Sequence, residues 1–82
     1  MSDDILDFIR GQAAEVLDVD AAEIGRETSL AEQYDADSID VIEIASAVER
    51  RFGIQVEDHE VYDLTSVGQF VDLVAAKVAA KP

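Results

Sequence analysis

The sequence predicts an all-α fold: a small four-helix bundle, made of three main helices plus a short third helix, with a long first loop. Three segments place apolar residues at three- and four-residue intervals, which puts them on one face of a helix. The one alternating segment, residues 54–57, is short and has no partner strand pattern, so it is expected to be an extended link. A chain of 82 residues has room for one domain, residues 1–82, with a compact core.

The first main helix is expected from about Asp3 to Leu17, with Ser2 as its N-cap. Asp3 and Asp4 in its first turn complement the partial positive charge of a helix start. Its polar residues fill the opposite face, so the helix is amphipathic and packs one side against the core. That apolar side consists of Ile5, Phe8, Ile9, Ala13, Val16 and Leu17.

The segment from Asp18 to Asp37 loses this period and is expected to form the long first loop. A connection of about twenty residues is unusual in so small a domain, which indicates either a function or an unrecognised turn of helix. Ser29, followed three residues later by Glu32, can cap such a turn. The apolar residues available to anchor the loop are Val19, Ile24, Leu30 and Tyr34.

The second main helix is expected over residues 38–52. Asp37 can cap its start, with Asp40 in the third helical position, and Gly53 can end it. The residues expected on its core face are Val41, Ile44, Ala45, Val48 and Phe52.

A short turn of helix from about Asp58 to Asp63 and a last helix from about Ser66 to Ala80 complete the predicted fold. Ser66 and Gln69 form a capping-box pair at the start of the last helix. The apolar residues expected in the core here are Val61, Leu64, Val67, Phe70, Val71, Val74 and Val78.

Charge and residue usage exclude several classes of function. Nineteen acidic and six basic residues give a net charge of −13, which opposes binding to nucleic acid or an anionic membrane and predicts basic protein partners. The absence of cysteine excludes disulfides, thiolate metal sites and cysteine nucleophiles. The apolar stretches are short, and the N-terminus is acidic where a signal peptide needs positive charge, so a cytoplasmic protein is expected.

The candidate functional residue is Ser38, at the predicted start of the second main helix. A helix start has unpaired backbone N–H groups and a partial positive charge, which favour an anionic phosphodiester attached there. The acidic residues between positions 35 and 49 would repel free phosphate, so their expected role is to steer basic partners to the serine. These residues are Asp35, Asp37, Asp40, Glu43 and Glu49.

The run from Asp37 to Ile44, with the sequence Asp-Ser-Ile-Asp-Val-Ile-Glu-Ile, resembles the acyl carrier proteins of fatty acid and polyketide synthesis. Residues 52–54 and 64–67 and the long first loop also fall where that family has similar residues, so the likeness covers nearly the whole chain. In that family, the serine after the aspartate carries a 4'-phosphopantetheine group, which a phosphopantetheinyl transferase adds from coenzyme A. Ser38 matches this serine.

This resemblance implies a carrier and not an enzyme. Such a carrier holds acyl intermediates as thioesters on its arm and delivers them to acyl-loading, ketosynthase or acyltransferase-type enzymes with basic docking patches. Part of the apolar core is then expected to border a cleft that shelters the acyl chain. The expected partner surface consists of Asp37, Ile39, Asp40, Ile42 and Glu43, in which Ile39 lies off the core face.

Some positions depart from the family pattern. Asp35 stands where glycine is common, and Ile39 replaces the usual leucine. Arg50 and Arg51 occupy places often held by acids, which favours a dedicated polyketide or other secondary-metabolite pathway, such as antibiotic biosynthesis. A housekeeping fatty acid carrier and an aminoacyl or peptidyl carrier are the alternatives. The short chain without flanking linkers favours a freestanding, monomeric carrier.

Three other classes of protein fit the sequence less well. An acidic interaction protein without covalent cargo fits the charge equally well, but it needs no particular serine at a helix start. A calcium loop beginning at Asp35 fails, because Ile39, Asp40 and Ser46 stand where it needs Asp or Asn, Gly and Glu. A serine hydrolase needs a base, and the one histidine, His59, lies in a short acidic segment without oxyanion-hole glycines and is expected at the surface.

Overall fold

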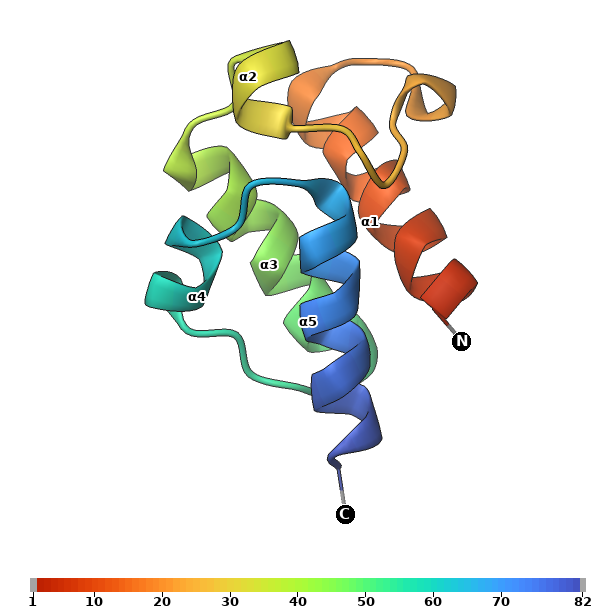
Figure 1. The fold of residues 1–82 in the computed structure, drawn as a ribbon, viewed down its shortest axis with the longest axis vertical. Helices are drawn as coiled ribbons and strands as arrows, with labels where there is room; N and C mark the ends of the chain where they lie inside the picture. Colours follow the sequence, from red (N-terminus) through yellow and green to blue (C-terminus); the bar gives the residue numbers. More distant parts are fainter. Residues whose placement is uncertain (1, 82) are drawn as a thin grey trace.

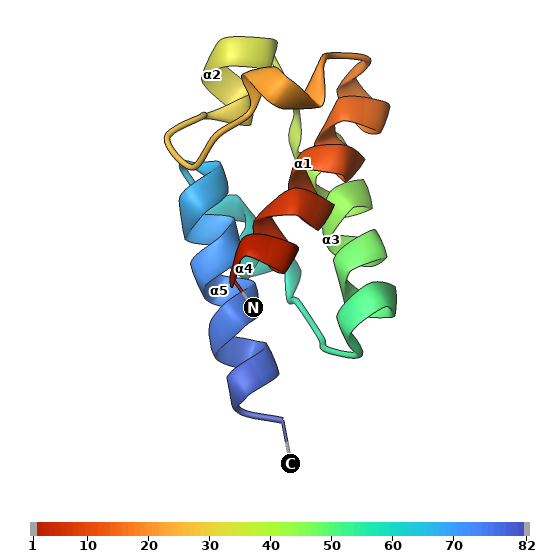
Figure 2. The ribbon, with the colours of Figure 1, turned by 90° about the vertical axis from the view of Figure 1, so that its right-hand side faces the viewer.

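The all-α prediction is confirmed by a computed structural model, which describes the backbone of residues 2–81 and the side chains of residues 3–81. No strand occurs between residues 2 and 81. The chain runs through the helices shown in Figure 1 and Figure 2. Their bounds are α1 Ser2–Leu17, the 3-10 helix η1 Ala21–Glu23, α2 Leu30–Tyr34, α3 Ser38–Phe52, α4 Asp58–Tyr62 and α5 Val67–Ala79.

Helices α1, α3 and α5 form the body of the bundle. Helix α1 packs against both α3 and α5, while the short α4 packs against α3 (Figures 1 and 2). Helix α2 lies across one end of the bundle, and the C-terminus of α5 points away from the other end (Figure 1). The largest fully buried side chains come from all three main helices and the first loop, and are Ile9, Ile24, Ile44, Val48, Val67, Phe70, Val71 and Val74. No helix within residues 2–81 has the length and apolar character needed to cross a lipid bilayer.

The long first loop contains two short helices. One of them is the turn of helix that Ser29 was predicted to cap. The Ser29 hydroxyl accepts a hydrogen bond from the Glu32 N–H at 3.3 Å and caps α2 as predicted. Asp20 caps η1 by accepting from the Ala22 N–H at 2.9 Å, and η1 itself was not predicted. All four predicted anchors, Val19, Ile24, Leu30 and Tyr34, are buried or half-buried against the core.

The loop is fastened to the start of α5. Val67 donates its N–H to the carbonyl oxygen of Thr28 at 2.9 Å, and Gly68 donates to that of Arg26 at 2.8 Å. The first N–H groups of a helix have no partner within the helix, so the loop carbonyls satisfy them. The buried Thr28 hydroxyl accepts from the Gly25 N–H at 2.8 Å, which closes the loop turn on itself. The connection over residues 18–37 is therefore ordered and lies across the end of the bundle. It is called the strap below.

Four predicted helix ends are shifted by one residue, including the start of α5, which is Val67 and not Ser66. Ser2 belongs to α1, so it is not the residue before the helix, and its side chain lies outside what the structure describes. Helix α4 ends at Tyr62 and α5 at Ala79, one residue earlier than predicted in each case.

The capping box at α5 is only half formed. The Ser66 hydroxyl accepts from the Gln69 N–H at 3.2 Å, as predicted. The amide oxygen of Gln69, however, accepts from the N–H of Thr65 at 2.8 Å and not from that of Ser66. The extended backbone that leads into α5 turns the Thr65 N–H toward this oxygen, so the return bond reaches one residue further back.

Candidate functional site

Ser38 is the first residue of α3, and its side chain is exposed. The residue before it, Asp37, is the predicted cap: its carboxylate accepts a hydrogen bond from the Asp40 N–H at 3.0 Å. In return, the Asp40 carboxylate accepts from the Asp37 N–H at 3.3 Å, which completes a capping box around the serine. The two bonds hold the backbone on both sides of Ser38, so they fix the direction of its Cα–Cβ bond at the helix start.

The turn between α2 and α3 explains an unusual residue near the site. Asp35 has a φ of 58° and a ψ of 30°, the left-handed conformation that glycine adopts with least strain. Its N–H bonds to the carbonyl oxygen of Leu30, and so does the N–H of Ala36 at 3.1 Å. Ala36 is buried and anchors this turn, a role that the sequence reading missed because a small apolar residue between two acids resembles ordinary loop composition.

The predicted partner residues divide into two groups. Ile39, Ile42 and Glu43 line one groove between α1 and α3, whereas Asp37 and Asp40 bond to each other at the helix start. Ile39 is 66% exposed, as expected for a residue off the core face. An isoleucine this exposed is suited to contact with another molecule, since its burial would remove apolar surface from water.

A second exposed hydrophobic residue was missed. Tyr62, the last residue of α4, is 60% exposed, and α4 packs against α3. The neighbouring Val61 is buried, and adjacent helical residues point in directions about 100° apart. Once Val61 is assigned to the core, that geometry turns Tyr62 outward, which is the signal that could have found it. His59 on the same helix is exposed, as predicted.

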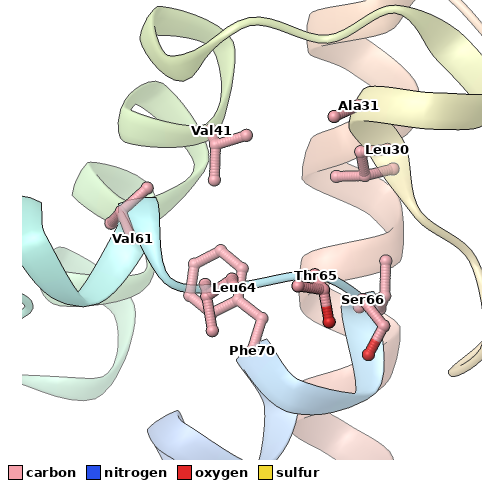
Figure 3. Close-up of a pocket in the computed structure, with 9 residues that line it drawn as sticks. Leu30, Ala31, Val41, Val61, Leu64, Thr65, Ser66 and Phe70 are labelled. Atoms are coloured by element: carbon pink, nitrogen blue, oxygen red, sulfur yellow. The ribbon is translucent and has the colours of Figure 1, made fainter.

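A small apolar cavity is lined by residues of α2, α3, α4, the start of α5 and the link before α5 (Figure 3). Its volume is about 50 Å³, and Val41, one helical turn beyond Ser38, forms part of its wall. The full lining is Leu30, Ala31, Val41, Val61, Leu64, Thr65, Ser66, Val67 and Phe70. Four of the core residues predicted in this region, Val61, Leu64, Val67 and Phe70, line the cavity. Val71 and Val74 are buried elsewhere in the core, and Val78 is partly buried against it.

An ion pair braces α4 beside this cavity. The Lys77 ammonium lies 3.0 Å from a carboxylate oxygen of Glu60, which also accepts the Glu57 N–H at 2.9 Å. The backbone hydrogen bond from Glu57, followed by the hydrogen bond from Lys77, holds the pKa of Glu60 below its usual value. Because Glu60 precedes the cavity residue Val61, the pair fixes α4 against α5.

Two further groups are perturbed in the strap that crosses the bundle end. Partial burial, and then the nearby Glu23 carboxylate, raise the pKa of Tyr34, whose hydroxyl lies 3.4 Å from that carboxylate. The hydrogen bond to Asp72 at 2.8 Å raises the pKa of Arg26. Among the described residues, no cluster of three His, Asp or Glu side chains is placed to hold a metal ion.

Comparisons with known proteins show which family this chain belongs to. A family model described as "Phosphopantetheine attachment site" matches residues 7–74. The chain is 35% identical over 80 residues to the acyl carrier protein of Picosynechococcus sp., a match that covers 98% of this chain and 99% of that protein. It is 36% identical over 77 residues to the acyl carrier protein of Thermosynechococcus vestitus, covering 94% of this chain and 95% of that protein. The chain therefore belongs to the acyl carrier proteins, a family of carriers and not catalysts that bear 4'-phosphopantetheine.

Proposed function

We propose that Ser38 is the attachment site, and that its hydroxyl oxygen forms the phosphodiester to 4'-phosphopantetheine. The observation that carries this proposal is the exposed Ser38 side chain at the first turn of α3, held between the two capping bonds of Asp37 and Asp40. The free N–H groups of a helix start stabilise the phosphodiester charge. A transferase can reach the hydroxyl without moving any other part of the domain.

Ser38 acts as an anchor and takes no part in acyl transfer. A nucleophilic serine needs an adjacent base, but both neighbouring carboxylates bond to backbone N–H groups. The cargo is held as a thioester on the thiol at the end of the arm. The first part of an acyl chain shelters in the cavity beside Val41, which at about 50 Å³ must enlarge to admit more than a short segment.

The partners are a phosphopantetheinyl transferase and the acyl-loading, ketosynthase or acyltransferase-type enzymes that use the loaded arm. Asp37, Ile39, Asp40, Ile42 and Glu43 form the surface that these enzymes meet, with the acids setting the approach of basic patches. The net charge of −13 also supports a monomer that works in the cytoplasm without binding nucleic acid or membranes.

We further propose that the carrier serves polyketide or other secondary-metabolite biosynthesis. Arg50 and Arg51 are both exposed in the last turn of α3, where they make the docking helix less acidic. A housekeeping fatty acid carrier is the alternative, and it is compatible with the family and with the relatives. An aminoacyl or peptidyl carrier is less well supported, because Asp37 and the acidic flank are more typical of acyl carriers.

The attachment is tested by incubating the apo protein with coenzyme A and a broad-specificity phosphopantetheinyl transferase. Intact-mass analysis should show one added phosphopantetheine on the wild type and none on Ser38→Ala. The matched control is Ser29→Ala, at the N-cap of α2 and outside the groove between α1 and α3, which should be modified like the wild type. Modification of Ser38→Ala would reject the assignment, and an unmodified wild type would favour an acidic interaction protein without cargo.

The pathway is tested by offering the holo protein in parallel to housekeeping fatty acid enzymes and to polyketide-type loading enzymes. The proposal expects loading by the polyketide-type set. Efficient elongation by the fatty acid enzymes alone would instead assign the carrier to housekeeping synthesis.

A further inference from the structure

A groove of about 360 Å³ runs between α1 and α3 and begins beside Ser38. Its walls come from two helices that pack directly on each other. The α1 wall is formed by Gln12 and Val16, which are one helical turn apart. The α3 wall consists of Ile39, Ile42, Glu43, Ser46, Ala47 and Arg50.

The α3 residues of this groove form one straight stripe. Their positions follow the i, i+3, i+4, i+7, i+8, i+11 pattern of a single helix face. At a rise of 1.5 Å per residue, the stripe from Ile39 to Arg50 is about 16 Å long, or about three helical turns. A groove of this length and shape, with apolar residues on its floor, fits an amphipathic helix laid along it.

The groove carries opposite charges toward its two ends. Glu43 lies nearer to Ser38, and Arg50 lies seven residues further along, about 10 Å away. Both side chains are at least partly open to solvent, and neither forms an ion pair or hydrogen bond with any residue between 3 and 81. The charges therefore remain available to a molecule that enters the groove.

The neighbouring arginine, Arg51, is also exposed, but it has a different contact and a different location. The Arg51 guanidinium lies over the Phe52 ring at 5.1 Å, and its side chain borders a different hollow, at the ends of α1 and α5. Adjacent residues of a helix point about 100° apart, so Arg50 and Arg51 face different surroundings. Only Arg50 belongs to the groove.

We propose that this groove receives a helix of a partner enzyme, and that Arg50 determines which partners fit. The partner helix has apolar residues over Ile39 and Ile42, a basic residue opposite Glu43 and an acidic residue opposite Arg50. This inference rests on the proposed carrier function and adds the charge order of its partners. A partner with a uniformly basic docking patch meets Arg50 as a like charge, which lowers its affinity.

Two other occupants fit the groove less well. A second copy of this chain would bring two molecules of net charge −13 together. The pantetheine arm is uncharged beyond its phosphodiester, so it would leave Glu43 and Arg50 without counter-charges. A partner helix satisfies both charges and the apolar floor at once.

The experiment uses a phosphopantetheinyl transferase with a uniformly basic docking patch and measures its KM for the apo carrier at low salt. Arg50→Glu should lower KM about tenfold, because it replaces a repulsive contact by an attractive one. Arg51→Glu is the matched control, since it makes the same change in net charge outside the groove, and should change KM by less than about twofold. The difference should disappear at high salt, because exposed charges are then screened.

The α1 wall is tested separately by substituting a bulky side chain that fills the groove. Gln12→Trp should raise KM about tenfold by filling the groove, whereas Gln33→Trp, on the exposed face of α2, should leave KM within about twofold of the wild type. Circular dichroism confirms that each variant is folded.

If all four variants have the KM of the wild type, or if the two arginine variants change KM equally, the groove is not a docking site. Ser38 would still be the attachment site. If neither the wild type nor the arginine variants are modified at any enzyme concentration, the proposed function fails and this inference fails with it. Association of the holo protein into dimers that Arg50→Glu abolishes would assign the groove to a second copy instead.

Discussion

Gly68 donates its N–H to the carbonyl oxygen of Arg26 at 2.8 Å, and a Cβ atom at Gly68 would lie 2.9 Å from that same oxygen. The opposing atom belongs to the backbone of the strap, so it cannot move aside as a flexible side chain can. Glycine at this position therefore allows α5 to approach the first loop closely enough for their hydrogen bonds.

Gly68→Ala should destabilise the protein by about 1–3 kcal/mol, although alanine is the better helix former. The control is Gly11→Ala on α1, where nothing lies within 4 Å of the added Cβ. There the helix propensity acts alone, and we expect a gain of about 0.5–1 kcal/mol. Urea unfolding followed by circular dichroism measures both. Equal effects at the two glycines would show that the strap does not restrict α5.

Asp35→Gly should raise the free energy of unfolding by about 0.5–1 kcal/mol, because φ is 58° at this position and glycine removes the strain of the left-handed conformation. Asp35→Ala keeps the Cβ without the short polar side chain that tolerates this region, so it should lower stability by a similar amount. Thermal unfolding of the two variants side by side gives the comparison, which fails if alanine proves as stable as glycine.

Substitutions at Asp37 separate its capping role from its charge. Asp37→Asn keeps an oxygen that can accept the Asp40 N–H, so stability should change by less than about 0.5 kcal/mol. Asp37→Ala loses the cap and should cost about 1 kcal/mol. At low salt, both variants should be modified at Ser38 more slowly than the wild type, because both lack the negative charge that attracts the transferase. If Asp37→Asn is modified at the wild-type rate, the charge plays no part in recognition.

The contribution of Glu60 to stability should depend on pH. Its pKa is lowered in the folded state by the Glu57 N–H and by Lys77, so it favours folding above the unfolded-state pKa of about 4.3. That contribution disappears as the pH falls through the folded-state pKa. The free energy of unfolding of Glu60→Gln should therefore lie below that of the wild type at pH 7, by up to about 1 kcal/mol, and approach it toward pH 3.

The measurement for Glu60 is urea unfolding of both proteins at a series of pH values. Taking the difference between them cancels the effect of the other acids, which are common to both. A difference that stays constant from pH 7 to pH 3 would show that the Glu60 contacts do not stabilise the folded state.

Helix α3 was predictable in full because its signals are local. Asp37 and Asp40 mark its start, Gly53 marks its end with a φ of 66°, and the apolar residues between them keep one period. The serine that matches the family lies within the same signals. The sequence therefore predicted both the helix and the candidate site on it.

The strap was not predictable in the same way. Its hydrogen bonds join Thr28 to Val67 and Arg26 to Gly68, residues that are far apart in the chain and whose pairing leaves no periodic pattern. The left-handed conformation of Asp35 was not predicted either, because an aspartate does not by itself indicate a positive φ as a glycine does. The α1/α3 groove needs two helices in contact before it exists, so only Ile39, Ile42 and Glu43 could be named in advance.

Because α5 is hydrogen-bonded to the strap, the α5 side of the cavity is stiffer than the opposite side. The α5 side of the cavity, at Val67, cannot retreat without breaking a main-chain hydrogen bond to Thr28. The opposite side is formed by α4, a five-residue helix, and by Leu64 in the connection that follows it (Figure 3). Short, partly exposed segments open at lower free energy than helices bonded to the core. We therefore expect cargo that outgrows the cavity to displace the link at Leu64, while Val67 and the strap carbonyl bonded to it keep their positions.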